Sequence, residues 1–391
     1  MSFKIEYDEL SKILSKGEDS QHQFKKNLTN ADSAACELVA FSNSGGGLLI
    51  IGIDDKTHQI TGLTLEEVSK LNVLFSNAAS QHVKPPINPL SCNISTPNGL
   101  VMAVKVPEGL NKPYTDLQGR IWVKSVGDKR HVTSREEIQR MFQEAGLVYA
   151  DEVPLNQRSI ADIDLKTFAD YFYKRYRKQP EETGLSFPRL LENLNLAQNG
   201  HPNLTGLLLF GMHPERYLPA FMVKAVSFPG VDVQGSKYID SEEIDGQLAK
   251  QYQHSLSFIK RNLHHIQGNR GVNSIGELEI SEDALEEILV NAFVHRDYFI
   301  SAPIKLFIFS DRVEIISPGH LPNHLTLEQI RYGLSNMRNP MISSHAVHML
   351  PYRGLGSGIP RTLQAWPHTD FVNDREGNQF KVILYRPKLK K

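Results

Sequence analysis

The stretch ALEEILVNAFVHRDY, at residues 284–298, is the most informative part of the C-terminal sequence of this chain. Its apolar residues recur at the three- and four-residue spacing of one helix face: Leu285, Ile288, Leu289 and Ala292. This pattern predicts a helix over residues 281–298, with Glu287 and Asn291 one turn apart on a second, polar stripe. An Asn carbonyl can bind a magnesium ion held by phosphates, and a Glu can orient or deprotonate a water molecule. This spacing alone also suits a solvated helix face. The neighbouring sequence is therefore needed to distinguish a functional site from a solvated surface.

Two glycine clusters follow this helix. The first is SPG at residues 317–319, directly after an expected strand. The second is GLGSGI at residues 354–359, before a helix expected at 361–366. Glycines in such loops let backbone amides approach phosphate oxygens, and a helix N-terminus favours the bound anion. The sequence contains no GxxxxGKS or GxxxxGKT segment, which excludes a P-loop ATPase and, with it, a helicase motor.

The ordered combination EEILVNAFVHRDY, DRVEIISPGHLP, RNP and GLGSGIPR resembles the divergent ATPase domain known as RecG-like C-terminal. That domain is similar to the GHKL-type fold of gyrase B, the ninety-kilodalton heat-shock protein, histidine kinases and MutL. The resemblance implies a Bergerat-type α/β sandwich that binds ATP with Mg2+. The enzymatic activity expected here is that of a weak ATPase.

The same resemblance implies roles for individual residues. Glu287 takes the place of the general base, and Asn291 that of the residue that binds magnesium through ATP. The two glycine boxes supply the remaining cofactor-binding residues: Ser317, Gly319, Gly354, Gly356 and Gly358. Ser317 stands where the wider superfamily has an Asp that reads the adenine amino group.

The N-terminal part is organised around the run NSGGGLLIIGI at residues 43–53. A short apolar run rich in β-branched residues after a glycine cluster predicts a buried strand, and a helix is expected just before it, over 32–43. Further on, cations gather beside aromatic side chains that offer stacking faces. The residues we expect to bind nucleic acid are Lys25, Lys112, Arg120, Trp122, Lys124, Lys129 and Arg130. Such a combination suits a phosphate backbone with partly unstacked bases.

Three stretches of the N-terminal part, QFK at 23–25, residues 36–55 and RIWVKSVG at 120–127, resemble the Schlafen AlbA-2 domain, an Alba-like nucleic-acid-binding fold. Some Schlafen relatives are metal-dependent ribonucleases that use two Glu residues and an Asp. If a nuclease site exists here, Glu18 and Asp54 would be its metal ligands, but Gln23 stands at the second Glu position. An amide cannot supply the negative charge that a catalytic magnesium needs, so we expect this site to be impaired.

The whole chain is expected to be an α+β multidomain protein with three domains. These are a Schlafen AlbA-2-like α/β domain, a middle α/β connecting domain and a divergent GHKL-type ATP-binding domain, at residues 1–148, 149–270 and 271–391. The connecting domain starts with a linker over 149–158, contains an expected strand at 207–210 and a long helix near 245–263, and serves as a scaffold.

The composition narrows the class of protein. Lys+Arg 43 against Asp+Glu 44 gives a net charge of -1, which excludes a globally basic nucleic-acid binder but not a local basic face. The two cysteines, Cys36 and Cys92, form no CxxC pair, so neither a disulfide framework nor a zinc ribbon is expected. The N-terminus lacks a signal-peptide pattern, and the apolar runs are too short for a membrane span, so we expect a cytoplasmic protein without a membrane partner.

Together these features predict a nucleic-acid-binding, ATP-dependent regulator of transcription. ATP and Mg2+ at the C-terminal domain would switch an N-terminal domain that binds DNA rather than RNA, in a homo-oligomer. Two alternatives stay open. One is a Schlafen-like, metal-dependent endoribonuclease of the phage-defence type regulated by nucleotide; the other is a non-hydrolysing nucleic-acid-binding module with a degenerate ATP site.

Overall fold

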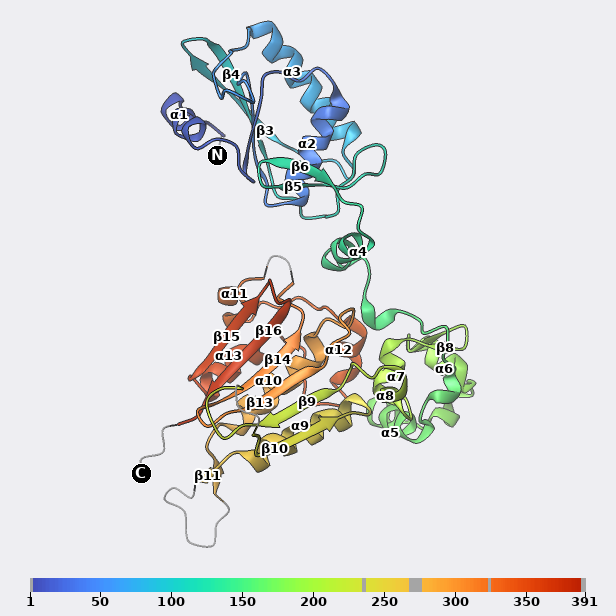
Figure 1. Cartoon of the computed structure of the whole chain (residues 1–391). Coiled ribbons are helices and arrows are strands. Elements are labelled where there is room, and N and C mark those ends of the chain that lie inside the picture. The colour runs from blue at the N-terminus through green and yellow to red at the C-terminus, as the bar shows by residue number, and fades with distance from the viewer. Residues whose placement is uncertain (1–2, 234–236, 267–275, 323–324, 388–391) are drawn as a thin grey trace. The chain divides into compact units, whose positions relative to one another are not determined.

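The computed structural model describes residues 3–233, 237–266, 276–322 and 325–387. The chain divides into two compact units, Met1–Val148 and Tyr149–Lys391 (Figure 1). Both units combine helices with mixed sheets, which confirms the expected α+β multidomain fold class.

The first unit is built on a sheet with the strand order β1-β2-β4-β3. Its strands are β1 (His22–Lys25), β2 (Gly47–Ile51), β3 (Leu90–Thr96) and β4 (Gly99–Val106). β1 and β2 are parallel, and the other neighbours are antiparallel. The expected strand in the LLIIGI run is therefore confirmed as β2, which lies inside the sheet. The first residue of β2 is Gly47. Only glycine fits at this position, because a Cβ there would lie 2.4 Å from the Phe41 ring and 2.5 Å from the Gln21 carbonyl oxygen.

Helices cover both faces of this sheet. The helical elements of the unit are α1 (Tyr7–Lys16), α2 (Ala31–Asn43), α3 (Leu65–Asn77), the π-helical turn η1 (Ala78–His82) and α4 (Arg135–Glu144). Because side chains alternate along a strand, Leu49 packs with α2 and α3, whereas Ile50 packs with Leu10 of α1 on the other face. A hairpin, β5 (Trp122–Ser125) and β6 (Asp128–His131), packs against α2.

The second unit contains a larger sheet with the order β10-β9-β13-β14-β16-β15. Its strands are β9 (Val223–Ser227), β10 (Asp240–Ile244), β13 (Ile304–Ile308), β14 (Arg312–Pro318), β15 (Thr369–Asp374) and β16 (Gln379–Tyr385). β9 and β13 are parallel, and all other pairs are antiparallel. The boundary expected at 270/271 lies outside the described residues, and strands from both sides of it share this sheet.

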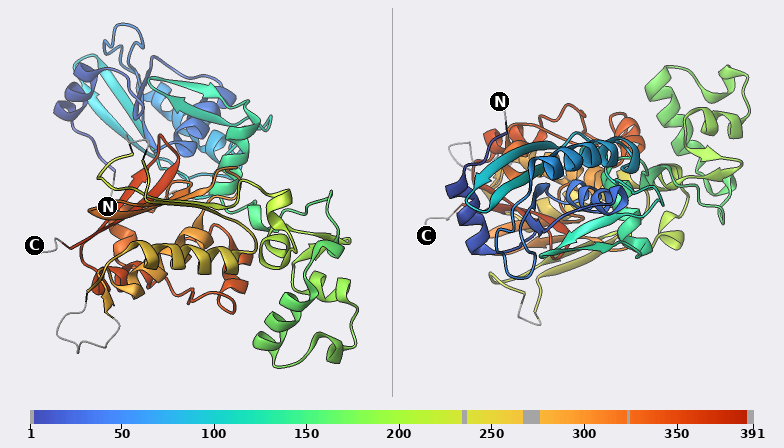
Figure 2. Two further views of the ribbon diagram at one scale, coloured as in Figure 1. Left: turned by 60° about the horizontal axis from the view of Figure 1, so that its bottom comes forward. Right: turned by 90° about the horizontal axis from the view of Figure 1, so that it is seen from above.

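Three helices cover one face of the larger sheet (Figure 2). They are α9 (Leu248–Asn262), α10 (Glu282–His295) and α13 (Gly358–Ala365). α10 lies between the other two and contacts β14. Its apolar stripe is buried as the spacing predicts, with Leu285 and Leu289 fully inaccessible to solvent. The short elements α11 (Leu327–Arg331), α12 (Pro340–Ala346), β11 (His265–Ile266) and β12 (Glu277–Leu278) complete this part.

A helical region precedes the sheet in the second unit. It consists of η2 (Ala150–Glu152), η3 (Ile160–Asp162), α5 (Leu165–Tyr176), η4 (Pro180–Thr183), α6 (Phe187–Asn193), β7 (Ala197–Gln198), β8 (His201–Pro202), α7 (Leu204–Phe210) and α8 (Pro214–Tyr217). The strand expected over 207–210 is wrong, because these residues belong to α7. Asn203 caps this helix by accepting a hydrogen bond from the Gly206 N–H at 2.8 Å. All seven residues of α7 are buried, and the wholly apolar run over 207–210 has no periodicity to separate helix from strand.

The expected linker is partly fixed to the second unit. Asp151 is fully buried, and its Oδ2 accepts hydrogen bonds from the backbone N–H groups of Met341 at 2.8 Å and Ile342 at 2.9 Å. These donors belong to the first turn of α12, so Asp151 supplies from a distance the acceptor that a helix N-terminus needs.

Burial raises the pKa of Asp151 from its ordinary 3.8 to about 6. Because the folded chain holds this proton more tightly, the associated stability is fully present below pH 3.8 and is lost as the pH rises through 6. The Asp151→Asn variant keeps an oxygen acceptor without the charge. We expect it to raise the free energy of unfolding by about 2–3 kcal/mol at a pH above 7 and to change it little near pH 4.

Urea unfolding of both proteins at the two pH values measures this difference. The exposed Asp170→Asn variant is the control and should follow the parent chain at both. Parallel pH profiles for the parent chain and Asp151→Asn would contradict the assigned cost of burying this carboxylate.

Candidate functional site

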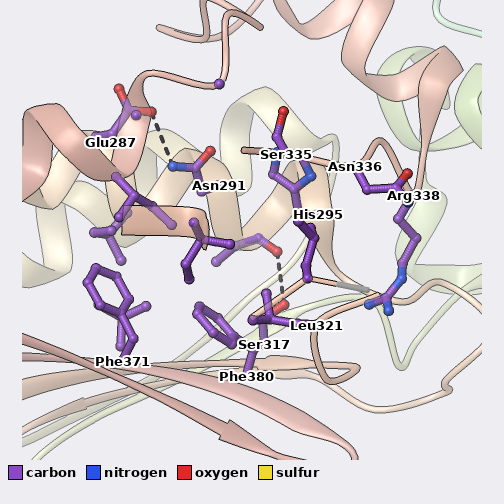
Figure 3. A pocket seen from close by; sticks show the side chains of 18 of the residues that line it. Glu287, Asn291, His295, Ser317, Leu321, Ser335, Asn336, Arg338, Phe371 and Phe380 are labelled. Atoms are coloured by element: carbon purple, nitrogen blue, oxygen red, sulfur yellow. Dashed lines mark hydrogen bonds between the residues drawn. The ribbon is translucent and has the colours of Figure 1, made fainter. Parts of the chain in front are cut away.

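A single pocket gathers the C-terminal residues that the sequence singles out. It lies between α10, the C-terminal strands of the larger sheet and the loops that contain the two glycine clusters, and Figure 3 shows it from close by. Its empty volume is about 1050 Å³ with the open mouth included, which is large enough for a small-molecule ligand. The lining includes all seven residues expected there: Glu287, Asn291, Ser317, Gly319, Gly354, Gly356 and Gly358.

The two walls of the pocket differ in chemistry. In Figure 3, Glu287 and Asn291 lie side by side on α10, while Phe371 and Phe380 lie towards the sheet. Phe371 and Phe380 stack on each other at 6.2 Å between ring centroids. An apolar wall opposite a few polar groups is the usual composition of a site that orients an organic ligand.

Glu287 is held by two partners from different parts of the chain. Its Oε1 accepts a hydrogen bond from Asn291 Nδ2 at 3.1 Å, and its Oε2 accepts one from Arg361 Nη2 at 2.5 Å. Arg361 lies in the first turn of α13 and closes the GLGSGIPR motif. Neither the helix pattern nor the glycine clusters singled out Arg361, although its place at the end of the motif was a signal for a role.

The second glycine cluster closes over this pair. A Cβ on Gly358 would lie 2.0 Å from Glu287 Oε1 and 3.0 Å from Asn291 Nδ2, so only glycine lets the loop approach so closely. Because Asn291 gives its amide hydrogen to Glu287, its carbonyl oxygen is the atom left to face a cation. An amide oxygen next to a carboxylate is a donor set that fits magnesium.

Ser317 and Gly319 form the base of the pocket. Ser317 is 7% exposed, and its Oγ donates a hydrogen bond to the Ala292 carbonyl at 3.1 Å, so Oγ has lone pairs but no free proton for a ligand. Gly319 has a φ of +97°, and a Cβ there would lie 2.4 Å from Arg338 Nη1. Arg338 Nη2 in turn donates to the His320 carbonyl at 2.8 Å, which fixes the loop after β14.

His295 is a further lining residue to which the sequence gave no role. Burial, together with the nearby Arg338 charge, lowers its pKa to about 4, so its imidazole is neutral at physiological pH. Its Nε2 lies 3.4 Å from the hydroxyl of Tyr352, which also lines the pocket. A neutral ring adds no charge to this end of the pocket.

In the first unit the structure brings together only part of the conditional nuclease set. Glu18 Oε1 accepts hydrogen bonds from Gln23 Nε2 at 2.6 Å and from the Phe24 N–H at 2.7 Å. Asp54 instead holds its own turn, with Oδ1 accepting from the Thr57 N–H at 2.9 Å. Within the described ranges, no group of three His, Cys, Asp or Glu side chains could hold a metal ion.

Family comparisons agree with this architecture. Residues 18–133 match the model described as "Schlafen, AlbA_2", and residues 301–384 match "Putative ATP-dependent DNA helicase recG C-terminal". The chain joins a Schlafen AlbA_2 domain to a RecG-like C-terminal domain. Residues 139–224 match a domain of unknown function, DUF8451.

No curated protein matches the chain. Among solved structures, the chain is similar to the DIP2311 protein from Corynebacterium diphtheriae, with 20% identity and a TM-score of 0.47. The alignment covers 96% of this chain and 79% of that one.

The match to the RecG-like C-terminal domain includes both glycine clusters and begins after α10. It therefore covers Ser317 and the glycines, whereas Glu287 and Asn291 lie outside it. The pocket brings these two residues together, and their roles stay predictions.

In the AlbA_2 domain, the cations expected to bind nucleic acid have partners within the domain. The ion pairs are Lys25–Asp55 at 3.9 Å, Lys112–Glu108 at 2.7 Å, Arg120–Asp116 at 2.7 Å, Lys129–Glu37 at 2.6 Å and Arg130–Glu137 at 2.5 Å. Lys124 Nζ donates to the side-chain oxygen of Gln23, Oε1, and burial lowers the pKa of Lys124. Trp122 Nε1 donates to Asp116 at 2.9 Å. The basic cluster seen in the sequence is thus largely compensated within the fold.

Along the described chain, no helix is both long and apolar enough to cross a membrane.

Proposed function

We propose that the C-terminal pocket binds ATP with Mg2+ and that this binding controls nucleic-acid binding by the AlbA_2 domain. The protein would act in transcription regulation as a cytoplasmic homo-oligomer that binds DNA rather than RNA. The observation that carries the proposal is the convergence of Glu287, Asn291 and Gly358, which come from two elements far apart in sequence.

Each part of the pocket suits one part of the nucleotide. The backbone of residues 354–358, at the N-terminus of α13, suits the phosphates, because unpaired amides and the helix dipole favour anions. Asn291 offers its carbonyl oxygen to magnesium. The rings of Phe371 and Phe380 supply an apolar surface for the base, and the Ser317 Oγ can accept a hydrogen bond from an amino group on it.

Glu287 is the candidate base for a weak ATPase activity. Magnesium would neutralise phosphate charge, and the carboxylate would orient or deprotonate a water molecule. Its ion pair with Arg361 favours the second candidate function, a nucleic-acid-binding module that holds ATP without hydrolysing it, because a carboxylate engaged by a guanidinium has fewer lone pairs for water. The amide of Gln23, which donates to Glu18, supports nucleic-acid binding over cleavage at the AlbA_2 domain.

The deciding experiment measures ATP binding by calorimetry with Mg2+, and hydrolysis, for the parent chain and Glu287→Gln. We expect the variant to keep its affinity within about threefold and to lose roughly 10²-fold in turnover, the usual contribution of a general base.

The matched control is Glu286→Gln, the same change on a half-buried neighbour that does not line the pocket. Undetectable ATP binding by the parent chain would overturn the proposal, and equal turnover in all three proteins would remove Glu287 from the mechanism. Binding without turnover in the parent chain would select the non-hydrolysing module. A DNA affinity that ATP and ADP leave unchanged would contradict the switch.

A further inference from the structure

The last turn of α5 and the residues after it form an unusual segment of the second unit. Residues 173–178 read YKRYRK, with four cations, two tyrosines and no carboxylate. We call it the α5 basic segment. It lies outside both the AlbA_2 domain and the nucleotide pocket.

The charges of this segment are available to a partner. Lys174, Arg177 and Lys178 are exposed, and within the part of the chain that the structure describes none of the three forms an ion pair. Asp170, one turn before Lys174, is exposed but makes no ion pair with it. Here the segment differs from the AlbA_2 domain, where the expected cations are compensated from within. Unpaired cations release counterions when they bind a polyanion, whereas paired cations must first give up a partner.

The two tyrosine rings of the segment are exposed, and neighbouring side chains hold the ring of Tyr176 in place. Tyr173 is 48% exposed and Tyr176 is 39% exposed. The Tyr176 ring lies 4.7 Å from the Phe172 ring, between centroids, and the Arg175 guanidinium lies 5.1 Å from the Tyr176 centroid. Arg175 is itself fixed, because its Nη1 donates to the Tyr171 hydroxyl at 2.5 Å. A ring held in this way before binding loses little conformational entropy when a base stacks on it.

The backbone also presents the last two cations. Arg177 ends α5 in the left-handed region, with φ 58°, and its N–H donates to the Tyr173 carbonyl at 2.8 Å. This cap turns the chain away from the helix axis at Arg177 and Lys178. The charges of the segment also act on a residue outside it. Burial and the positive charges of Arg175 and Lys174 lower the pKa of His348.

We propose that the α5 basic segment is a second nucleic-acid contact, which binds a single strand through phosphate pairing at Lys174, Arg177 and Lys178 and base stacking on Tyr173 and Tyr176. Alternating cations and exposed rings fit a charged backbone with unstacked bases. A bilayer would need an apolar face to insert, and the apolar side of α5, with Phe168 and Phe172, is buried in the core.

The test uses the full chain and a labelled single-stranded 20-nucleotide oligothymidylate, with fluorescence anisotropy at two salt concentrations. The variant reverses three charges: Lys174→Glu, Arg177→Glu and Lys178→Glu. The control makes the same charge change at exposed cations elsewhere in the second unit, Lys166→Glu, Lys250→Glu and Arg375→Glu. We expect the first variant to bind at least about tenfold more weakly and with a shallower salt dependence, and the control to stay within about threefold of the parent chain.

A second variant, Tyr173→Ala, tests stacking without a change of charge. We expect about fivefold or more weaker binding with an unchanged salt dependence. Equal losses in the two triple variants would overturn the proposal, because they would report net charge alone. So would a segment variant that keeps its oligothymidylate affinity but loses binding to phosphatidylserine vesicles. The AlbA_2 domain is intact in all variants, so any contact it makes contributes equally to each.

Discussion

A Gly358→Ala substitution is expected to reduce the kcat/KM of ATP hydrolysis by roughly 10³-fold while the chain still folds. The added Cβ would lie 2.0 Å from Glu287 Oε1, so the carboxylate has to leave its position between Asn291 and Arg361. The displaced atom ends a flexible side chain, and the φ of Gly358 is not in the left-handed region, so little stability is lost. The estimate combines about 10²-fold for the lost base with about tenfold for weaker nucleotide binding.

Hydrolysis kinetics and calorimetry with ATP and Mg2+ measure the loss, and thermal unfolding checks the fold. The control is Gly230→Ala in the same unit, where a Cβ would meet nothing within 4 Å. If both alanine variants bind and hydrolyse ATP like the parent chain, the glycine cluster does not serve the Glu287–Asn291 pair.

Replacing Arg296 with Ala is expected to lower the free energy of unfolding by about 3–5 kcal/mol. Arg296 is 2% exposed, and its Nη2 donates to the carbonyls of Ile300 at 3.1 Å and Ala302 at 2.6 Å. Its guanidinium lies 4.7 Å from the ring centroid of Phe221 and 4.8 Å from that of Tyr298. Truncation would leave two carbonyl oxygens without their donor and a cavity between the two rings.

The Arg296→Met variant separates these two effects, because it fills the cavity but restores no donor. We expect it to cost about 1–3 kcal/mol, less than the Ala variant, in urea unfolding. An Ala variant within 1 kcal/mol of the parent chain would show that this buried cation does not stabilise the connection between α10 and β13.

Periodicity and motif order could indicate which residues line the pocket, because these residues lie along regular elements or next to their ends. The stripe of α10 has one apolar and one polar side, and both are where the 3.6-residue period puts them. Ser317 is the last residue but one of β14 and Gly358 is the first residue of α13, so the strand and the helix carry them to the same place. Local pattern is sufficient when secondary structure determines the position of a side chain.

Long-range pairing could not be predicted in the same way. Lys129 meets Glu37 from 92 residues away, and Glu37 is buried within α2, where a carboxylate is rare. The cations are close together in the sequence and could be recognised as a cluster. An acid such as Glu37 is distant in the sequence, so its pairing with a cation could not be recognised there. The helix α7 was missed for a related reason, since its burial on all sides is a property of the tertiary fold.

The larger sheet also decides how this chain can be divided. β9 pairs with β13 along five residues, from Ile304↔Val223 to Ile308↔Ser227. A fragment that begins at residue 271, or one confined to the matched segment 301–384, would lack β9 and leave the backbone groups of β13 open along a bare edge. Such an edge recruits other strands, so the fragment would be prone to aggregation. The ATPase-like segment is thus not expected to fold on its own, because its sheet includes strands from the residues that precede it.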